Sequence, residues 1–154
     1  MDKNEFAART EQIKTRLYRT AFLYLGSENM AFDAVSEAIY KGFASLKKLR
    51  QPEYFETWLT RILINECKKE LRRRKREEPL DTIPEIASDL FDALPLKEAI
   101  RRLPQELKEV LILRYFSDFT LVETARSLEI PQGTVVTRQR RALALLKLEL
   151  SEEE

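Results

Sequence analysis

The sequence predicts an all-α protein, and three observations support that prediction. Glycine is scarce, with 3 residues among 154. No segment alternates apolar and polar residues convincingly at a period of two, which is the pattern of a half-buried strand. Long stretches instead repeat apolar residues at spacings of three and four, as one face of an α-helix requires. The chain is long enough to bury a core as one medium domain or two small ones.

Two helices are expected at the start of the chain. The first begins near Asp2 or Asn4 and is stopped by Gly26, a residue that readily takes the left-handed conformation closing a helix. Ser27 or Asn29 can cap the second helix through a side-chain oxygen. We expect its inward face to carry Met30, Ala34, Val35, Ala38 and Ile39.

A third helix is expected to include Pro52, which fits its first turn. Its apolar stripe starts at Phe55 and persists to Leu71, and the helix is predicted to reach Arg76. The last turns read KKELRRRKR from Lys68 onward, and they cannot all be buried. We interpret them as a phosphate-binding stripe, because the helix dipole alone favours only one or two cations there.

Charge is distributed unevenly along the chain, although the formal net charge is only +1. Basic residues concentrate at 68–76 and 138–141, whereas acidic residues follow the first basic cluster and close the chain. Such segregation creates local fields that the net charge conceals. The predicted division is a first domain at 1–76, an acidic linker at 77–94, a second domain at 95–150 and an acidic tail at 151–154.

Two short helices are expected after the linker. The first, between Leu96 and Leu103, repeats apolar residues at helical spacing and is ended by Pro104. Pro104 also starts the next helix, which runs to a turn at 117–119.

A helix-turn-helix is predicted from Thr120 to Lys147. Thr120 and Glu123 can form a capping box at its start, and Glu129, Ile130 and Pro131 break its first helix. The second helix has an apolar stripe made of Val135, Ala142, Leu143 and Leu146.

The outward face of this second helix combines short hydroxyls with long guanidinium groups. It carries Thr134, Thr137, Arg140 and Arg141, with Val136 and Arg138 on its flanks. Such a face suits the major groove of DNA, because arginine can pair bidentately with guanine and a threonine methyl can touch thymine. From this segment alone, a solvated basic face is the alternative.

Several function classes find no support in the sequence. The single cysteine, Cys67, excludes an internal disulfide, and without histidine no plausible zinc ligand set exists. There is no glycine-rich phosphate loop, histidine-based triad or obvious carboxylate pair, so we expect neither an enzyme nor a cofactor. No apolar run approaches a membrane span, and the N-terminus lacks the hydrophobic core of a signal peptide. A cytoplasmic protein is therefore expected.

Taken together, these segments resemble the small bacterial sigma factors of the extracytoplasmic-function (ECF) group. In the first half the resemblance rests on LYRTAFLYL (17–25), AFDAVSEAIYKGF (31–43) and FETWLTRILINECKKELRRRKR (55–76). In the second half it rests on LPQELKEVLILRYF (103–116) and IPQGTVVTRQRRAL (130–143). It implies two helical domains, sigma region 2 and sigma region 4, joined by the acidic linker.

The resemblance also implies roles for individual residues. Asp33, Ser36 and Glu37 would dock on core RNA polymerase. The melted strand of the -10 element would be bound by Arg61, Asn65, Lys68, Lys69, Arg72 and Arg73. The -35 element would be bound by Arg114, Thr134, Val136, Thr137, Arg138, Arg140 and Arg141. Asn65 would lie beside a flipped-base pocket whose variable wall is the loop 49–54.

Further implications concern partners and aromatic residues. An anti-sigma factor, often membrane-bound in this group, is an expected partner besides core polymerase and promoter DNA, and no small-molecule substrate is expected. The acidic linker would thread through the polymerase cleft. Phe55 and Trp58 could stack on bases, but their place on an apolar stripe favours core packing.

Two other functions compete with a promoter-specificity subunit. A stand-alone helix-turn-helix regulator would bind duplex DNA by itself, usually as a dimer. An interaction protein or sigma-like decoy would bind only a partner protein. The stand-alone regulator leaves the first domain and its basic third helix unexplained.

Overall fold

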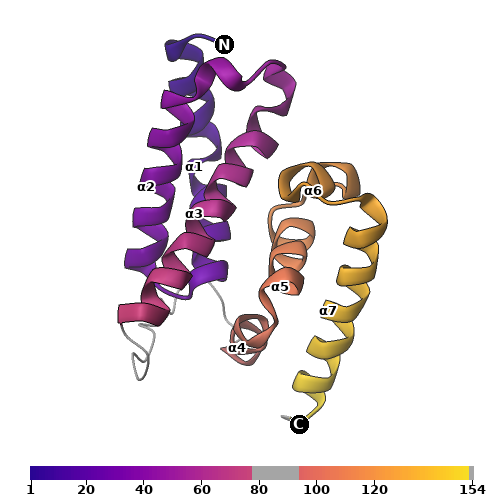
Figure 1. The fold of residues 1–154 in the computed structure, drawn as a ribbon. Coiled ribbons are helices and arrows are strands. Elements are labelled where there is room, and N and C mark those ends of the chain that lie inside the picture. The colour runs from indigo at the N-terminus through magenta and orange to yellow at the C-terminus, as the bar shows by residue number, and fades with distance from the viewer. Residues whose placement is uncertain (78–93, 153–154) are drawn as a thin grey trace. The chain divides into compact units, whose positions relative to one another are not determined.

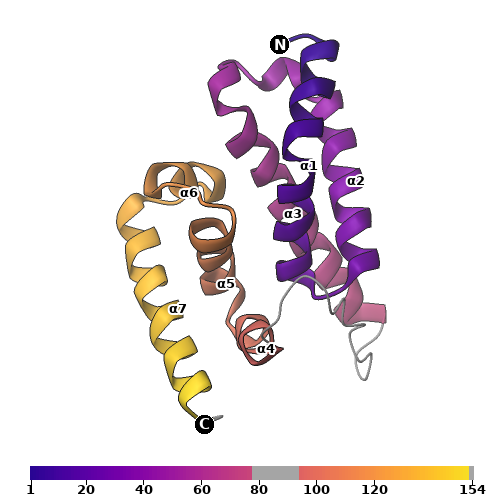
Figure 2. The ribbon, with the colours of Figure 1, turned by 180° about the vertical axis from the view of Figure 1, so that it is seen from behind.

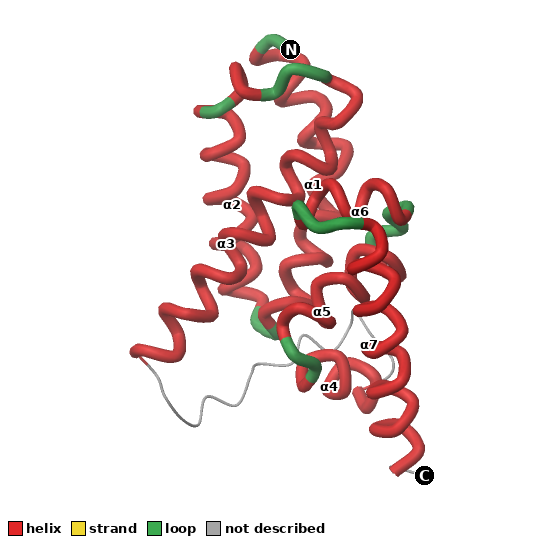
Figure 3. Tube along the Cα trace, turned by 45° about the vertical axis from the view of Figure 1, so that its right-hand side comes forward, coloured by secondary structure: helices red, strands yellow, loops and turns green. Residues whose placement is uncertain are grey.

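The computed structural model describes residues 1–77 and 94–152 (Figure 1). Within these ranges every regular element is helical, which confirms the all-α prediction (Figure 3). The chain divides into two compact units, Met1–Glu85 and Ile86–Glu154. The predicted linker at 77–94 lies almost wholly outside the described residues.

Helix α1 (Lys3–Leu25) begins and ends at the signals expected from the sequence. The Asp2 side chain accepts a hydrogen bond from the Glu5 N–H at 2.8 Å and so caps the first turn. Gly26 closes the helix with φ 73°, and its N–H donates to the Phe22 carbonyl at 2.8 Å. A left-handed closing residue favours glycine because a side chain would crowd the backbone there.

Helix α2 (Glu28–Ala44) is capped by Ser27, whose hydroxyl accepts from the Met30 N–H at 3.3 Å. Of the face predicted to point inward, Ala34, Val35 and Ala38 are buried, while Met30 and Ile39 are half-buried. A short 3-10 helix, Leu46–Lys48, follows α2.

Helix α3 (Phe55–Glu77) does not include Pro52, so that prediction is wrong. Pro52 instead begins a 3-10 turn, Pro52–Tyr54, which leads directly into α3 and in which the Tyr54 N–H donates to the Gln51 carbonyl at 3.0 Å. This i to i+3 bond winds the chain more tightly than an α-helix does, and α-helical geometry starts only at Phe55. At its other end α3 extends to Glu77, one residue past the predicted Arg76.

The three helices of the first unit lie side by side and run alternately in opposite directions (Figures 1 and 2). Phe6, near the start of α1, lies where α2 ends and α3 begins, with its ring 5.6 Å from that of Phe55 and 5.7 Å from that of Phe43. Phe55 is 1% exposed, so it belongs to the core and not to a base-stacking surface. Gly42 keeps α2 close to α3, because a Cβ there would lie 2.8 Å from the Leu59 Cδ1.

The second unit contains α4 (Leu94–Arg102), α5 (Gln105–Leu111), α6 (Leu121–Leu128) and α7 (Gln132–Glu152). Between α5 and α6 the chain makes a π-helical turn, Ile112–Phe116, which the sequence did not predict. α7 packs against α4, α5 and α6 (Figure 2). The core joining these helices includes Val110, Ala125 and Val135.

One residue of the predicted α7 stripe lies on the surface. Val135, Ala142 and Leu146 are buried as expected, but Leu143 is 41% exposed. Leu143 is about 100° around the helix from Ala142, which turns it away from the line that the three buried residues share.

Candidate nucleic-acid interface

The turn that joins α6 to α7 is fixed by local contacts. The Thr120 N–H donates to Glu123 Oε1 at 2.8 Å and the Glu123 N–H donates to Thr120 Oγ1 at 3.1 Å, so the predicted capping box is confirmed. Glu129 ends α6 in the left-handed conformation with φ 57°. The next N–H, of Ile130, donates to the Ala125 carbonyl at 3.1 Å. This bond closes the end of α6, two residues before α7 begins at Gln132.

The α7 residues predicted to contact DNA differ in exposure. Thr137, Arg140 and Arg141 are exposed, while Thr134, Val136 and Arg138 are half-buried. Arg138 leans toward α5, with its Nη2 3.8 Å from Glu106 Oε2. Across the described residues, Arg140 and Arg141 make no hydrogen bond or ion pair, so their guanidinium groups are available to a ligand.

Thr137 has part of its hydrogen-bonding capacity already in use. Its Oγ1 donates to the Gly133 carbonyl one turn earlier at 3.1 Å. The hydroxyl proton is therefore committed to the backbone, and toward a ligand the side chain offers an acceptor oxygen and a methyl group.

Arg114 is held by the protein on the inner side of α7. Its Nε donates to Gln139 Oε1 at 3.0 Å, and its Nη1 donates to the Phe119 carbonyl at 2.8 Å. Gln139 in turn donates from Nε2 to the Tyr115 hydroxyl at 3.0 Å. The network joins the π-helical turn to α7, a link between residues 25 apart that the sequence pattern does not reveal.

The residues predicted to bind the -10 strand lie along one side of α3. A helical turn of 100° per residue places Arg61, Asn65, Lys68 and Arg72 on a common face, with Lys69 and Arg73 on its flank. Asn65, Lys69, Arg72 and Arg73 are exposed, while Arg61 and Lys68 are half-buried. The structure thus gathers this predicted set on a single surface.

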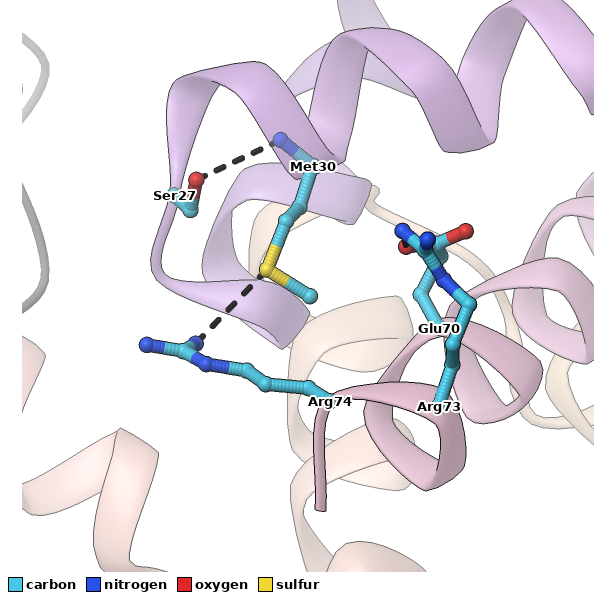
Figure 4. A network of polar contacts seen from close by, with 5 residues as sticks. All are labelled: Ser27, Met30, Glu70, Arg73 and Arg74. Carbon is cyan, nitrogen blue, oxygen red and sulfur yellow. Dashed lines mark hydrogen bonds and ion pairs between the residues drawn. The ribbon is translucent and has the colours of Figure 1, made fainter. Parts of the chain in front are cut away.

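At the far end of α3, two arginines differ in their surroundings (Figure 4). Arg73 pairs with Glu70 at 2.8 Å on the same helix, which offsets part of its charge. Arg74 donates from Nη1 to the Met30 sulfur at 3.6 Å and so ties the end of α3 to the start of α2. Arg72, with no partner of either kind in the described ranges, is better placed for a phosphate than Arg73.

A pocket of about 300 Å³ opens beside Asn65. It is lined by Tyr40, Lys41, Ala44, Ser45, Ile62, Asn65 and Glu66. The loop 49–54, which was expected to form a wall, is described throughout and is not part of this lining. Helix α2 takes that place and contributes Lys41, whose Nζ lies 2.6 Å from Glu66 Oε2.

The Lys41–Glu66 pair links α2 to α3 in a partly buried setting. The Glu66 side chain is 9% exposed, whereas the Lys41 side chain remains 37% exposed. The hydrogen bond to the Glu66 carboxylate raises the pKa of Lys41, and that effect outweighs the opposing desolvation. Sequence analysis missed both residues, because the 25 positions between them give no sign of their contact.

The outward face of α2 carries the residues predicted to dock on polymerase. Asp33, Ser36 and Glu37 are all exposed. Three large aromatic residues share this side of the helix: Phe32 at 62% exposed, Tyr40 at 68% and Phe43 at 43%. These aromatic residues are spaced by eight and three positions and lie on the side of the helix opposite the buried alanines. The sequence alone therefore contained the signal for this exposed face. Exposed aromatic clusters of this kind mark protein-binding surfaces.

Two negative findings apply to the described residues. They contain no group of three or more Asp, Glu, His or Cys side chains that could hold a metal ion, and Cys67 is buried. None of their helices combines the length and the apolar character needed to cross a bilayer.

Comparison with known families accounts for both units. Residues 10–77 match the family model of Sigma-70 region 2, and residues 99–148 match that of Sigma-70, region 4. The chain is 33% identical over 146 residues to RNA polymerase sigma factor SigV of Bacillus subtilis, with 92% of this chain and 88% of the relative covered. The chain belongs to the ECF sigma factors. A second relative, ECF RNA polymerase sigma factor SigW of the same organism, is 26% identical over 169 residues, covering 97% of this sigma factor and 90% of SigW.

Solved structures share the fold of this sigma factor. RpoE from Bartonella quintana, solved with the anti-sigma factor NepR, superposes with a TM-score of 0.81 at 22% identity, covering 97% of this chain and 99% of that one. CnrH, solved with the cytosolic domain of CnrY, superposes with a TM-score of 0.80 at 19% identity, covering 99% and 92%. At these identities the likeness concerns the fold alone.

Membership of this family defines the general function. The protein is an alternative sigma factor, which associates with RNA polymerase, binds DNA and directs transcription initiation. A stand-alone regulator would need only the helix-turn-helix, whereas region 2 occupies residues 10–77 of this chain. The predicted fold and function are thus confirmed at the level of the family.

Proposed function

We propose that this sigma factor reads the -35 element with α7 and holds the melted -10 strand on α3. The observation that carries the proposal is the coexistence of two exposed basic surfaces, one on a helix-turn-helix and one beside a pocket. A helix-turn-helix surface suits duplex DNA, whereas a basic surface next to a pocket suits an unpaired strand. The protein would perform no covalent chemistry itself and would act in the cytoplasm, where the polymerase transcribes.

In the -35 complex, the exposed residues of α7 would have distinct roles. Arg140 and Arg141 have uncommitted guanidinium groups that can pair with guanine edges or phosphates. Thr137 would accept from an amino group of a base or touch a thymine methyl, because its proton is already donated to Gly133. Val136 and Thr134 would add contacts at the edges of this surface.

Arg114 and Arg138 would act mainly by positioning the reading helix. Arg114 makes two hydrogen bonds to protein acceptors, and Arg138 lies near Glu106. Each of these arginines can bind a phosphate only through the guanidinium N–H groups that these contacts do not use. Their loss would therefore disturb the orientation of α7 as well as DNA affinity.

In the -10 complex, the α3 stripe would bind the backbone and Asn65 would read a base. Arg61, Lys68, Lys69, Arg72 and Arg73 would supply the positive charge. Asn65 can donate and accept hydrogen bonds at the Watson–Crick edge of a base that has left the stack. Its exposed amide lies at the pocket, which would receive that base.

Core polymerase would bind the outward face of α2. Phe32 and Phe43 would supply apolar contact area, while Asp33, Ser36 and Glu37 would supply polar specificity at its margin. An anti-sigma factor is a second proposed partner. RpoE and CnrH, which share this fold, were each solved with a protein partner.

The test compares duplex binding and strand opening with and without core polymerase. Gel shift should give a promoter complex only when core polymerase is present, and permanganate should modify thymines in an opened -10 region. Asn65→Ala should reduce permanganate reactivity while core binding remains intact. Loss of core binding by this variant would instead assign Asn65 to the protein interface or the fold, and promoter binding without polymerase would contradict the proposal.

A further inference from the structure

The ion pair in the pocket beside Asn65 makes the pocket chemically unusual for a site on a basic surface. Lys41 Nζ and Glu66 Oε2 are 2.6 Å apart, so their charges largely cancel at longer range. The remaining polar lining residues, Tyr40, Ser45 and Asn65, have uncharged side chains at neutral pH. The lining residues together carry no net charge, so the pocket suits a neutral polar ligand.

The walls of the pocket also suit a flat ligand. Ala44 and Ile62 provide apolar contact, and Tyr40 is 68% exposed, so its ring can stack on a planar group. The volume of about 300 Å³ lies at the lower end of the range for small-ligand pockets. A nucleobase is a neutral planar group with polar edges, and it fits a pocket that lies beside a basic stripe.

We propose that Glu66, held in place by Lys41, makes this pocket select a base with an exocyclic amino group and reject thymine. The inference rests on the proposed function, in which the pocket receives an extruded base of the -10 strand. An ionised carboxylate can only accept hydrogen bonds, and its two oxygens have capacity beyond the bond from Lys41.

The hydrogen-bonding edges of the four bases explain the selection. Adenine, cytosine and guanine each present an amino group that can donate to the Glu66 carboxylate, as in carboxylate–cytosine pairing. Thymine presents two carbonyl oxygens on either side of its single N–H, and these oxygens would face the carboxylate. A matched pair of this kind contributes about 1–3 kcal/mol of discrimination, so thymine should bind roughly tenfold more weakly.

The experiment uses holoenzyme assembled from the full chain and core polymerase. The probes are fluorescent promoter duplexes with a preformed bubble across the -10 region, in which each unpaired position carries each of the four bases in turn. Wild-type holoenzyme should prefer the -10 bubble over a scrambled one, and one position should disfavour thymine about tenfold. At that position, a deaminated analogue such as purine for adenine or 2-pyrimidinone for cytosine should also weaken binding.

Three variants test the role of the carboxylate. Glu66→Gln keeps the shape of the side chain and adds a donor that thymine can accept, so the thymine penalty should fall to about threefold or less. Lys41→Arg preserves an ion pair and should retain the penalty. Glu70→Gln is the matched control, because Glu70 lies one turn along α3, pairs with Arg73 and does not line the pocket.

The outcomes separate this inference from the proposed function. If wild-type holoenzyme does not distinguish the -10 bubble from the scrambled one, the proposed function fails. If it does distinguish them but Glu66→Gln has the wild-type base preference at every position, the inference about Glu66 is overturned. Circular dichroism and core binding establish that the variants are folded and assembled.

Discussion

Replacing Arg114 by methionine separates a residue that positions the reading helix from one that contacts DNA. Methionine keeps much of the apolar stem but removes the donors to Gln139 and to the Phe119 carbonyl, which lie at 3.0 and 2.8 Å. A hydrogen bond from a charged group contributes about 1.5–3 kcal/mol. With two such bonds on a half-buried side chain, we expect the free energy of unfolding of the second unit to fall by about 3 kcal/mol.

The comparison variant is Arg140→Met. Arg140 is exposed and has no partner in the described part of the chain, so its replacement should change the free energy of unfolding by no more than about 0.5 kcal/mol. It should nevertheless weaken promoter binding. Thus Arg114→Met should lower both stability and DNA affinity, whereas Arg140→Met should lower affinity alone.

Urea unfolding can assign the effect to the correct unit. Far-ultraviolet circular dichroism reports on all helices, whereas the fluorescence of Trp58, the single tryptophan, reports on the first unit. Arg114→Met should shift the dichroism transition and leave the fluorescence transition in place. Equal stability of the two variants, within about 0.5 kcal/mol, would refute the positioning role of Arg114.

Three further predictions concern packing, pH and base recognition. Gly42→Ala should lower the free energy of unfolding by about 1 kcal/mol, because the cost of overpacking against Leu59 exceeds the gain in helix propensity. Adding Leu59→Val should restore part of this stability, and a Gly42→Ala protein more stable than wild type would contradict the packing account. Pairing with Glu66 raises the pKa of Lys41 above the ordinary lysine value of 10.5. The pair therefore contributes its full stability to the fold below pH 10.5, and this contribution is lost as the pH rises through the raised pKa of the folded state. As the pH rises above 10.5, the melting temperature of the wild type should therefore fall further than that of Lys41→Gln. An equal fall in the two proteins would contradict a stabilising role of the pair. Arg141→Ala should cost about 1–3 kcal/mol at one base of the -35 element and relax preference there, and an unchanged preference in promoter selection would remove that assignment.

Features encoded by neighbouring residues were predictable from the sequence. The caps at Asp2, Gly26 and Ser27 and the capping box of Thr120 with Glu123 all depend on contacts within four residues. Each is signalled by a residue type at a set distance from an apolar repeat. The gathering of basic residues on one side of α3 follows in the same way from helical spacing.

Two errors in the predicted fold arose where a local signal fits more than one structure. Leu143 lies in a run of apolar residues, 142–146, in which several registers look equally amphipathic. The helices that α7 packs against decide which of these apolar residues are buried, and they bury Ala142 and Leu146 but not Leu143. Pro52 is compatible with the first turn of either an α-helix or a 3-10 helix, and the chain takes the second.

Contacts between distant segments could not be predicted from spacing. The bond between Arg114 and Gln139 and the pair of Lys41 with Glu66 each join residues 25 positions apart. Sequence resemblance assigned Arg114 to DNA, but its surroundings give it a structural role as well. The pocket wall formed by α2 likewise depends on how two helices pack, and no local motif encodes it.

The most direct test of the central claim is transcription from a randomised promoter library by purified core polymerase, with and without this chain, followed by sequencing of the transcribed templates. If the protein is a sigma factor that reads both elements, its addition should enrich a -35 motif and a -10 motif at a fixed spacing. Unchanged transcription in the presence of folded protein would contradict that account.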